Sequence, residues 1–246
     1  MRPAVTCWMV CCVGAVVADD AAKKSDAKAS DRRAAQRALE PFNDWVGTWR
    51  GVGQPRRGSS KGAWTEKAQW AWKIDRESAG IAVKIEKGKL ITEGVLGYDP
   101  AEKRFHFKSQ SPDGESRTYV GSPAEEGKLM LTTAAAESEA QHRLTFQIRH
   151  VDRLLLLVET RAAGQTSFSR VAEIGYTREG GSFASQADSG PKCIVTGGRG
   201  TMTVTYKGKT YYVCCSGCKQ AFDDDPEGII ADAAERKKKE AEPKKK

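Results

Sequence analysis

Apolar and polar residues alternate with a period of two through most of residues 42–178. Trp70 and Trp72 share one phase of this pattern, and Leu144 and Phe146 share a phase further along the chain. Such alternation is typical of β-strands that bury one face, and it differs from the spacing of an amphipathic helix. Glycine, proline and aspartate interrupt it about every ten residues, as turns do. The sequence therefore predicts consecutive antiparallel strands joined by short connections.

The spacing of the turns predicts about eight to ten strands. A meander of this length has two exposed edges, and closing the sheet into a barrel removes them. We therefore predict a mainly β fold, in which a closed antiparallel β-barrel over residues 42–178 is followed by a small α+β module over residues 193–230 that carries cysteines.

Residues 1–18 have the pattern of a secretory signal peptide. Arg2 precedes an apolar run, and small residues lead to Ala18 before an acidic pair. The run is shorter than the roughly 18 residues that a membrane span requires, so no transmembrane segment is predicted. The sequence thus predicts an exported protein, periplasmic or secreted, and a buried N-terminal segment is the alternative.

Charged or polar segments flank the predicted domains. Residues 19–41 are rich in alanine, lysine and aspartate, which predicts a linker or a charged helix. Residues 179–192 are small and polar, as in a linker, and residues 231–246 form a basic tail that we expect to be disordered. The net charge of +8 arises mostly from this tail. Because no basic stripe with interleaved aromatic residues occurs elsewhere, no nucleic-acid partner is predicted.

The predicted barrel opens on glycines placed around a tryptophan. Residues 47–53 read Gly-Thr-Trp-Arg-Gly-Val-Gly, which resembles the first strand of lipocalin-like barrels and, more closely, the opening of nitrobindin-like domains. In such barrels the tryptophan packs at the closed end against an arginine from the last strand. The resemblance implies these roles for Trp49 and Arg178, through ring packing and a cation–π contact.

The resemblance to nitrobindin-like domains also implies a haem-ligating histidine late in the barrel. His142 and His150 share the phase of Leu144, whereas His106 lies in the opposite phase to its aromatic neighbours. A histidine at the surface or at a strand end is the competing interpretation of each. A barrel of this size can also enclose a small apolar ligand, which the sequence does not identify.

The sequence contains no catalytic motif in the structural context that its chemistry requires. His-Glu-x-x-His does not occur, and the one Gly-x-Ser-x-Gly, at residues 58–62, lies between two predicted strands and not between a strand and a helix. The carboxylates of the barrel segment fall mostly in predicted turns, where solvation is the default. We therefore expect a protein without enzymatic activity.

The cysteines that follow the predicted signal peptide all lie in the last quarter of the chain: Cys193, Cys214, Cys215 and Cys218. Alternation on both sides of Lys207-Gly208-Lys209 predicts a hairpin that brings the first of these cysteines beside the others. A short helix is predicted next, ending near Asp225-Pro226. A hairpin followed by a helix, with thiols at both ends, is how small zinc-binding domains gather ligands that are distant in sequence.

The cysteine segment resembles the TRASH/YHS family, in which a first cysteine is followed at a long interval by a Cys-x-x-x-Cys pair. Cys193, Cys214 and Cys218 match that signature. The resemblance implies a treble-clef-like fold that binds heavy metals in sensing, trafficking or resistance. Many members carry a further cysteine where this chain has Thr196, and Cys215 is conversely an extra thiol.

Thiolates favour soft ions such as zinc and copper(I). We therefore predict an exported metal-binding protein whose ligands are Cys193, Cys214 and Cys218, with Cys215 as candidate fourth ligand and Lys219 as the cation nearest the thiolates. Two alternatives stay open. Disulfides could staple the module of a small-ligand or haem carrier, or Cys215 and Cys218 could act as the redox pair of a thiol oxidoreductase.

Overall fold

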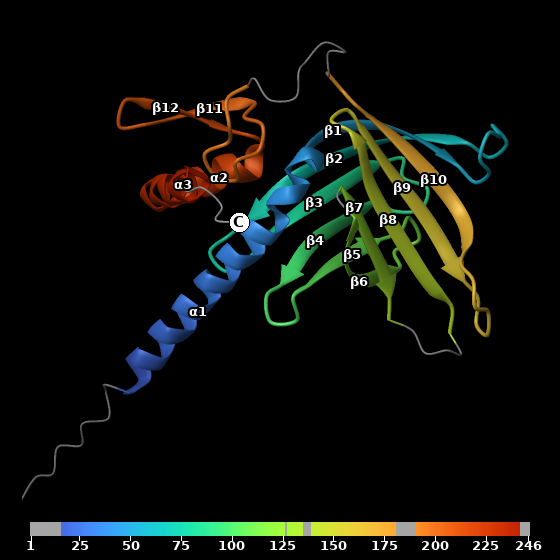
Figure 1. Cartoon of the computed structure of the whole chain (residues 1–246), viewed down its shortest axis with the longest axis horizontal. Helices are drawn as coiled ribbons and strands as arrows, with labels where there is room; N and C mark the ends of the chain where they lie inside the picture. The colour runs from blue at the N-terminus through green and yellow to red at the C-terminus, as the bar shows by residue number, and fades with distance from the viewer. Residues whose placement is uncertain (1–15, 126, 135–138, 181–189, 242–246) are drawn as a thin grey trace, which may run out of the picture.

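The computed structural model describes residues 16–125, 127–134, 139–180 and 190–241, and within them ten antiparallel strands close into a barrel. Each strand pairs with its neighbours in sequence, and the first strand also pairs with the last (Figure 1). The predicted closed antiparallel barrel is therefore confirmed. The strands are β1 (Gly47–Gln54), β2 (Trp64–Ile74), β3 (Ala79–Glu86), β4 (Glu93–Asp99), β5 (Arg104–Gln110), β6 (Ser116–Glu125), β7 (Lys128–Thr133), β8 (Gln141–His150), β9 (Arg153–Arg161) and β10 (Ser169–Arg178).

Helices and a hairpin flank the barrel. Before it, the segment expected to be a linker or a charged helix is helical. Most of the predicted signal peptide and most of the predicted linker after β10 lie outside the described residues. None of the described helices is both long and apolar enough to cross a membrane. The flanking elements are α1 (Val16–Leu39), the 3-10 helix η1 (Glu40–Trp45), β11 (Met202–Tyr206), β12 (Lys209–Val213), α2 (Ser216–Asp224) and α3 (Pro226–Ala241).

The described part of the basic segment is helical, whereas disorder was expected. The first predicted helix of the module ends at Asp224, close to the expected place, but α3 then continues through Ala241. Ile229 and Ala233 lie one turn apart and are both buried, and Arg236 hydrogen-bonds to main-chain carbonyls of the module. These tertiary contacts stabilise a helix that composition alone does not predict.

Aromatic side chains fill one end of the barrel. η1 places Trp45 inside, where its ring centroid lies 5.2 Å from that of Trp70 and 4.9 Å from that of Phe146. Phe42, from the same short helix, meets Phe105 edge to face at 5.3 Å. The residues between α1 and β1 therefore form a plug at this end of the barrel.

Arg178 closes the same end, as the resemblance implied. Its guanidinium lies 4.1 Å from the ring centroid of Trp49 and donates to the carbonyl oxygens of Val46 at 2.8 Å and Val151 at 3.2 Å. Burial lowers the pKa of Arg178. Gly47 has a φ of +133°, and a Cβ there would lie 2.6 Å from the arginine Nη1. Glycine is therefore required where the chain passes the guanidinium.

The two later glycines of the motif leave room for a buried polar group. A Cβ on Gly51 would lie 2.6 Å from the Tyr176 ring, and one on Gly53 would lie 2.3 Å from the Trp64 ring. These two rings donate hydrogen bonds to the buried carboxylate of Glu66, the indole at 2.6 Å. Burial and the neighbouring carboxylate raise the pKa of Tyr176 well above its usual value.

Candidate metal centre

The β11–β12 hairpin brings the distant cysteines together, as the alternation predicted. Ile194 and Thr201 precede the hairpin. The main-chain N–H of Ile194 donates to the carbonyl of Tyr212 in β12 at 2.8 Å, and that of Thr201 donates to the carbonyl of Val213 at 2.9 Å. The segment that begins at Cys193 is thereby held alongside β12, whose end leads directly into the remaining cysteines.

Cys193 begins a tight loop that ends at Gly198. The N–H of Gly197 donates to the Cys193 carbonyl at 2.9 Å, and the Cys193 N–H donates to the Gly198 carbonyl at 2.6 Å. Gly197 has a φ of +74°, a conformation that favours glycine. The loop presents a cysteine whose exposed fraction is 1%.

The N-terminal end of α2 holds two further cysteines. Cys215 is the N-cap residue, with an extended backbone, and Cys218 lies in the first turn of the helix. The positive end of a helix dipole favours ionised sulfur, and this effect acts on the N-cap sulfur of Cys215.

Three sulfur atoms form a compact group. Those of Cys193, Cys214 and Cys218 all lie within 4.8 Å of one another, and the last two are 3.4 Å apart. We call these three residues the cysteine triad. The Cys215 sulfur is 3.8 Å from that of Cys214 but is outside the mutual group. The four described cysteines are all free, and the sulfur atoms of three predicted ligands converge while that of Cys215 lies to one side.

Proton sharing divides the four thiols into two kinds. Hydrogen bonds from Cys214 and Cys218 lower the pKa of Cys193, and the same two partners lower that of Cys215. The reciprocal contacts, that with Cys193 first, raise the pKa of Cys214 and of Cys218. A metal ion bound by these sulfur atoms would replace the thiol protons, so its affinity would rise with pH.

The structure places two neighbours of the triad, Lys219 and Thr196. Lys219 is not a partner of the thiolates, because its ammonium pairs with Asp223 one turn along α2. Thr196, at the position of the additional family cysteine, is buried, and its hydroxyl lies 3.7 Å from the Cys214 sulfur. A hydroxyl group therefore contacts the triad where many family members have a thiol.

Side chains from both ends of the chain hold the Cys193 loop by its carbonyl oxygens. Gln36 of α1 donates to Val195 at 2.8 Å, and Asn43 of η1 donates to Thr196 at 2.9 Å. Arg236 of α3 also donates to Val195, at 3.1 Å. We call Gln36, Asn43 and Arg236 the loop clamp. Because two of its members precede the barrel, the centre is packed against the barrel and does not hang free on a linker (Figure 1).

β2 also contacts the centre directly. The main-chain N–H of Trp72 donates to the Cys215 sulfur at 3.3 Å, and the indole N–H of the same residue donates to Asn43 at 3.0 Å. Gly217 packs so closely that a Cβ there would lie 1.7 Å from the Trp72 carbonyl oxygen. Sequence reasoning missed this contact because every non-proline residue has a main-chain N–H. The one available signal was a glycine in a helix, where it is unfavourable unless something packs against it.

The histidines considered as haem ligands lie toward strand ends. His150 is exposed at the end of β8, and its Nδ1 accepts the N–H of Asp152. His142 is half-buried near the start of the strand, and burial lowers its pKa. The interior beside β8 is instead occupied by Phe146 and the rings packed on it.

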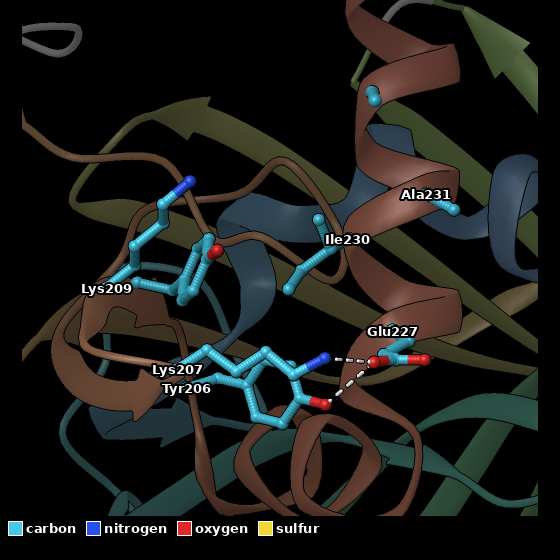
Figure 2. Close-up of a pocket in the computed structure, with 8 residues that line it drawn as sticks. Tyr206, Lys207, Lys209, Glu227, Ile230 and Ala231 are labelled. Atoms are coloured by element: carbon cyan, nitrogen blue, oxygen red, sulfur yellow. Dashed lines mark hydrogen bonds and ion pairs between the residues drawn. The ribbon is translucent and has the colours of Figure 1, made fainter.

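A groove of about 360 Å³ lies between the β11–β12 hairpin and α3. Figure 2 shows Lys207 and Tyr206 pointing toward Glu227, which accepts from the ammonium at 2.5 Å and from the phenol at 3.0 Å. None of the four described cysteines lines this groove. Its central polar groups bond to one another. The groove is therefore separate from the cysteine triad.

Comparison with known proteins identifies part of the chain. Residues 198–228 match the family model of the YHS domain, which confirms the resemblance inferred for the C-terminal module. The match includes Cys214, Cys215 and Cys218, whereas Cys193 precedes it. No curated protein matches the sequence.

Among solved structures, an S-type phycobiliprotein lyase from Guillardia theta matches with 14% sequence identity and a TM-score of 0.37. The match covers 61% of this chain and 98% of the lyase. This match contradicts the expectation of a protein without enzymatic activity, because a phycobiliprotein lyase is an enzyme. At this level of similarity the match assigns no reaction to the present chain.

Proposed function

We propose that this protein is an exported metal-binding protein that holds one soft metal ion, zinc or copper(I), for trafficking or sensing. The carrying observation is the convergence of three sulfur atoms within 4.8 Å of one another. Cys193, Cys214 and Cys218 would supply thiolate ligands, which suit soft ions better than hard ones. The match to the YHS domain supports metal binding in general. Export rests on the signal-peptide pattern of residues 1–18 alone.

Several features of the module support a preformed site for such an ion. The main-chain bonds of the Cys193 loop and the loop clamp fix one ligand, and the N-terminal end of α2 fixes another. Cys193 and Cys218 are buried, so the ion would be shielded from water on that side. A site held in this way loses little conformational entropy on binding, and burial strengthens its bonds to the charged ion.

The first prediction concerns metal content. The full chain, purified under reducing conditions, is expected to contain about one zinc or copper ion per molecule, because three converging thiolates favour a soft ion. The double substitution Cys214→Ser and Cys218→Ser removes two members of the triad and is expected to abolish the content. Elemental analysis measures both, with Ser216→Ala, an exposed neighbour, as the matched control.

Two other results would contradict the metal proposal and point to the alternatives. Metal-free protein without titratable thiols would indicate disulfides that staple the module. Metal-free protein whose thiols oxidise and reduce reversibly, with loss of that cycle in Cys218→Ser, would favour a thiol oxidoreductase.

A second candidate function, a carrier of a small ligand, is favoured by one observation in the barrel. Trp70 is buried beside Trp45 and Phe107, yet its indole N–H has no acceptor among the described residues. An unsatisfied buried donor costs about 1–3 kcal/mol. A ligand with an acceptor atom would recover that free energy.

The carrier proposal predicts a bound molecule in the full chain. Native mass spectrometry is expected to detect a non-covalent adduct whose occupancy falls in Trp70→Phe and stays unchanged in Tyr212→Phe, an exposed control. A Soret absorption band would identify the ligand as haem. A single unliganded mass for the gently purified chain would exclude the carrier.

A further inference from the structure

The four sulfur atoms differ in how they reach solvent. Cys193 and Cys218 have exposed fractions of 1% and 0%. Cys214 and Cys215 are half-buried and adjacent in sequence, at the junction between β12 and α2. An ion that approaches from solvent therefore meets Cys214 or Cys215 before it meets the two buried members of the triad.

Cys215 is also held from outside the module. Its sulfur accepts the main-chain N–H of Trp72 in β2 at 3.3 Å, and Gly217 rests on the carbonyl of the same residue. A hydrogen bond to sulfur withdraws electron density that would otherwise be donated to a metal, so this sulfur is a weaker ligand than one without such a bond. The contact also resists rotation of the side chain away from β2.

The triad is held by different contacts, namely main-chain bonds within the module and the loop clamp. The Cys193 loop is closed by its own main-chain bonds and held through Val195 and Thr196. The Cys215 sulfur lies 3.8 Å from the Cys214 sulfur, so an ion can pass between the two without leaving sulfur coordination.

We propose that Cys215 is the exchange ligand of the centre: it takes the incoming ion from a small thiol or from water and passes it to the cysteine triad, while the N–H of Trp72 keeps its sulfur outside the resident ligand set. This inference rests on the proposed function, and it assigns different roles to the adjacent thiols of Cys214 and Cys215.

The transfer requires no change of oxidation state. A metal–sulfur bond to Cys215 forms as a bond from the ion to its previous ligand breaks, and any thiol proton leaves to solvent. The ion then bonds to Cys214, and the bond to Cys215 breaks as bonds to Cys193 and Cys218 form. The protons held by these thiols are released at that stage. By microscopic reversibility, removal of the ion follows the same steps backward.

The test uses cadmium(II) as a soft probe ion whose thiolate bonds give an ultraviolet charge-transfer band. The full chain is loaded with one equivalent, and the loss of the band is followed after excess EDTA is added. In Cys215→Ser the affinity for cadmium and the band intensity per ion are expected to stay near wild type, while the rate of removal falls about tenfold or more. Cys215→Ala is a second variant, and Ser216→Ala is the matched control.

Each other outcome has a defined meaning. If Cys215→Ser weakens cadmium binding about 100-fold and the band loses intensity, Cys215 is a fourth resident ligand and the exchange proposal is wrong. An unchanged removal rate with unchanged affinity also overturns it. If wild-type protein binds no cadmium, the proposed metal function itself fails, and that result is separate from any effect of the variants.

Discussion

Arg178→Ala is expected to lower the free energy of unfolding by about 3 kcal/mol, since several buried interactions are lost at once. The guanidinium donates to three carbonyl oxygens, those of Asp44, Val46 and Val151, and packs on the Trp49 ring. Alanine leaves these carbonyls without their donor and exposes one face of the indole. Urea denaturation of the full chain, followed by circular dichroism, measures the change.

Two variants separate this effect from a general loss of positive charge. Arg50 lies next to Trp49 in sequence but is exposed on the outer face of β1, so Arg50→Ala should change stability by less than about 0.5 kcal/mol. Arg178→Lys keeps the charge but lacks the planar fork that reaches several carbonyls, so it should fall between the two. An Arg178→Ala protein as stable as Arg50→Ala would show that the closed end does not depend on the guanidinium.

Gly217→Ala is expected to separate the module from β2. The added Cβ would lie 1.7 Å from the Trp72 carbonyl oxygen and 2.8 Å from its carbonyl carbon, and main-chain atoms in a barrel strand cannot move aside easily. Alanine favours a helix over glycine by up to about 1 kcal/mol. The clash costs about 1–3 kcal/mol or more, so the steric effect dominates.

Hydrogen–deuterium exchange of the full chain measures the separation. The peptide that contains Trp72 is expected to exchange faster in Gly217→Ala, because the N–H then has no sulfur acceptor. Gly175 in β10 is the matched control, since a Cβ there would meet no atom within 4 Å. Unchanged protection at Trp72 in the Gly217 variant would contradict the contact. Bound metal should remain near the wild-type level, because every cysteine is still present.

Most of the barrel could be predicted from the sequence, because the alternation of apolar and polar side chains indicates which face of each strand is buried. Alternation over residues 42–178 indicates which face each residue takes, and turns mark where strands end. Trp49 and Arg178 were paired through a resemblance and then found in contact. Alternation does not predict the plug formed by η1, because Phe42 and Trp45 are buried from a short 3-10 helix and not from a strand.

The sequence predicted which cysteines form the centre, but it did not predict that the Cys215 sulfur lies to one side. Cysteine spacing and the hairpin turn placed Cys193, Cys214 and Cys218 together, because backbone geometry fixes how a hairpin returns. The displacement of Cys215 depends on a main-chain N–H of Trp72, which leaves no trace in the sequence. The extent of α3 depends likewise on buried contacts such as that of Ile229. The prediction of a disordered tail relied on its basic composition, which does not indicate these contacts.

The loop clamp also bears on the order in which the molecule is completed. Gln36 reaches across 159 residues of sequence to the Cys193 loop, and Asn43 reaches across 153. Contacts between such distant residues form late in folding, because the loss of chain entropy precedes their gain. Cys193, Cys214 and Cys218 also follow the whole barrel in the sequence, so they are synthesised after it. A bound ion would therefore mark chains whose barrel has already closed, and metal occupancy would serve as a readout of finished folding.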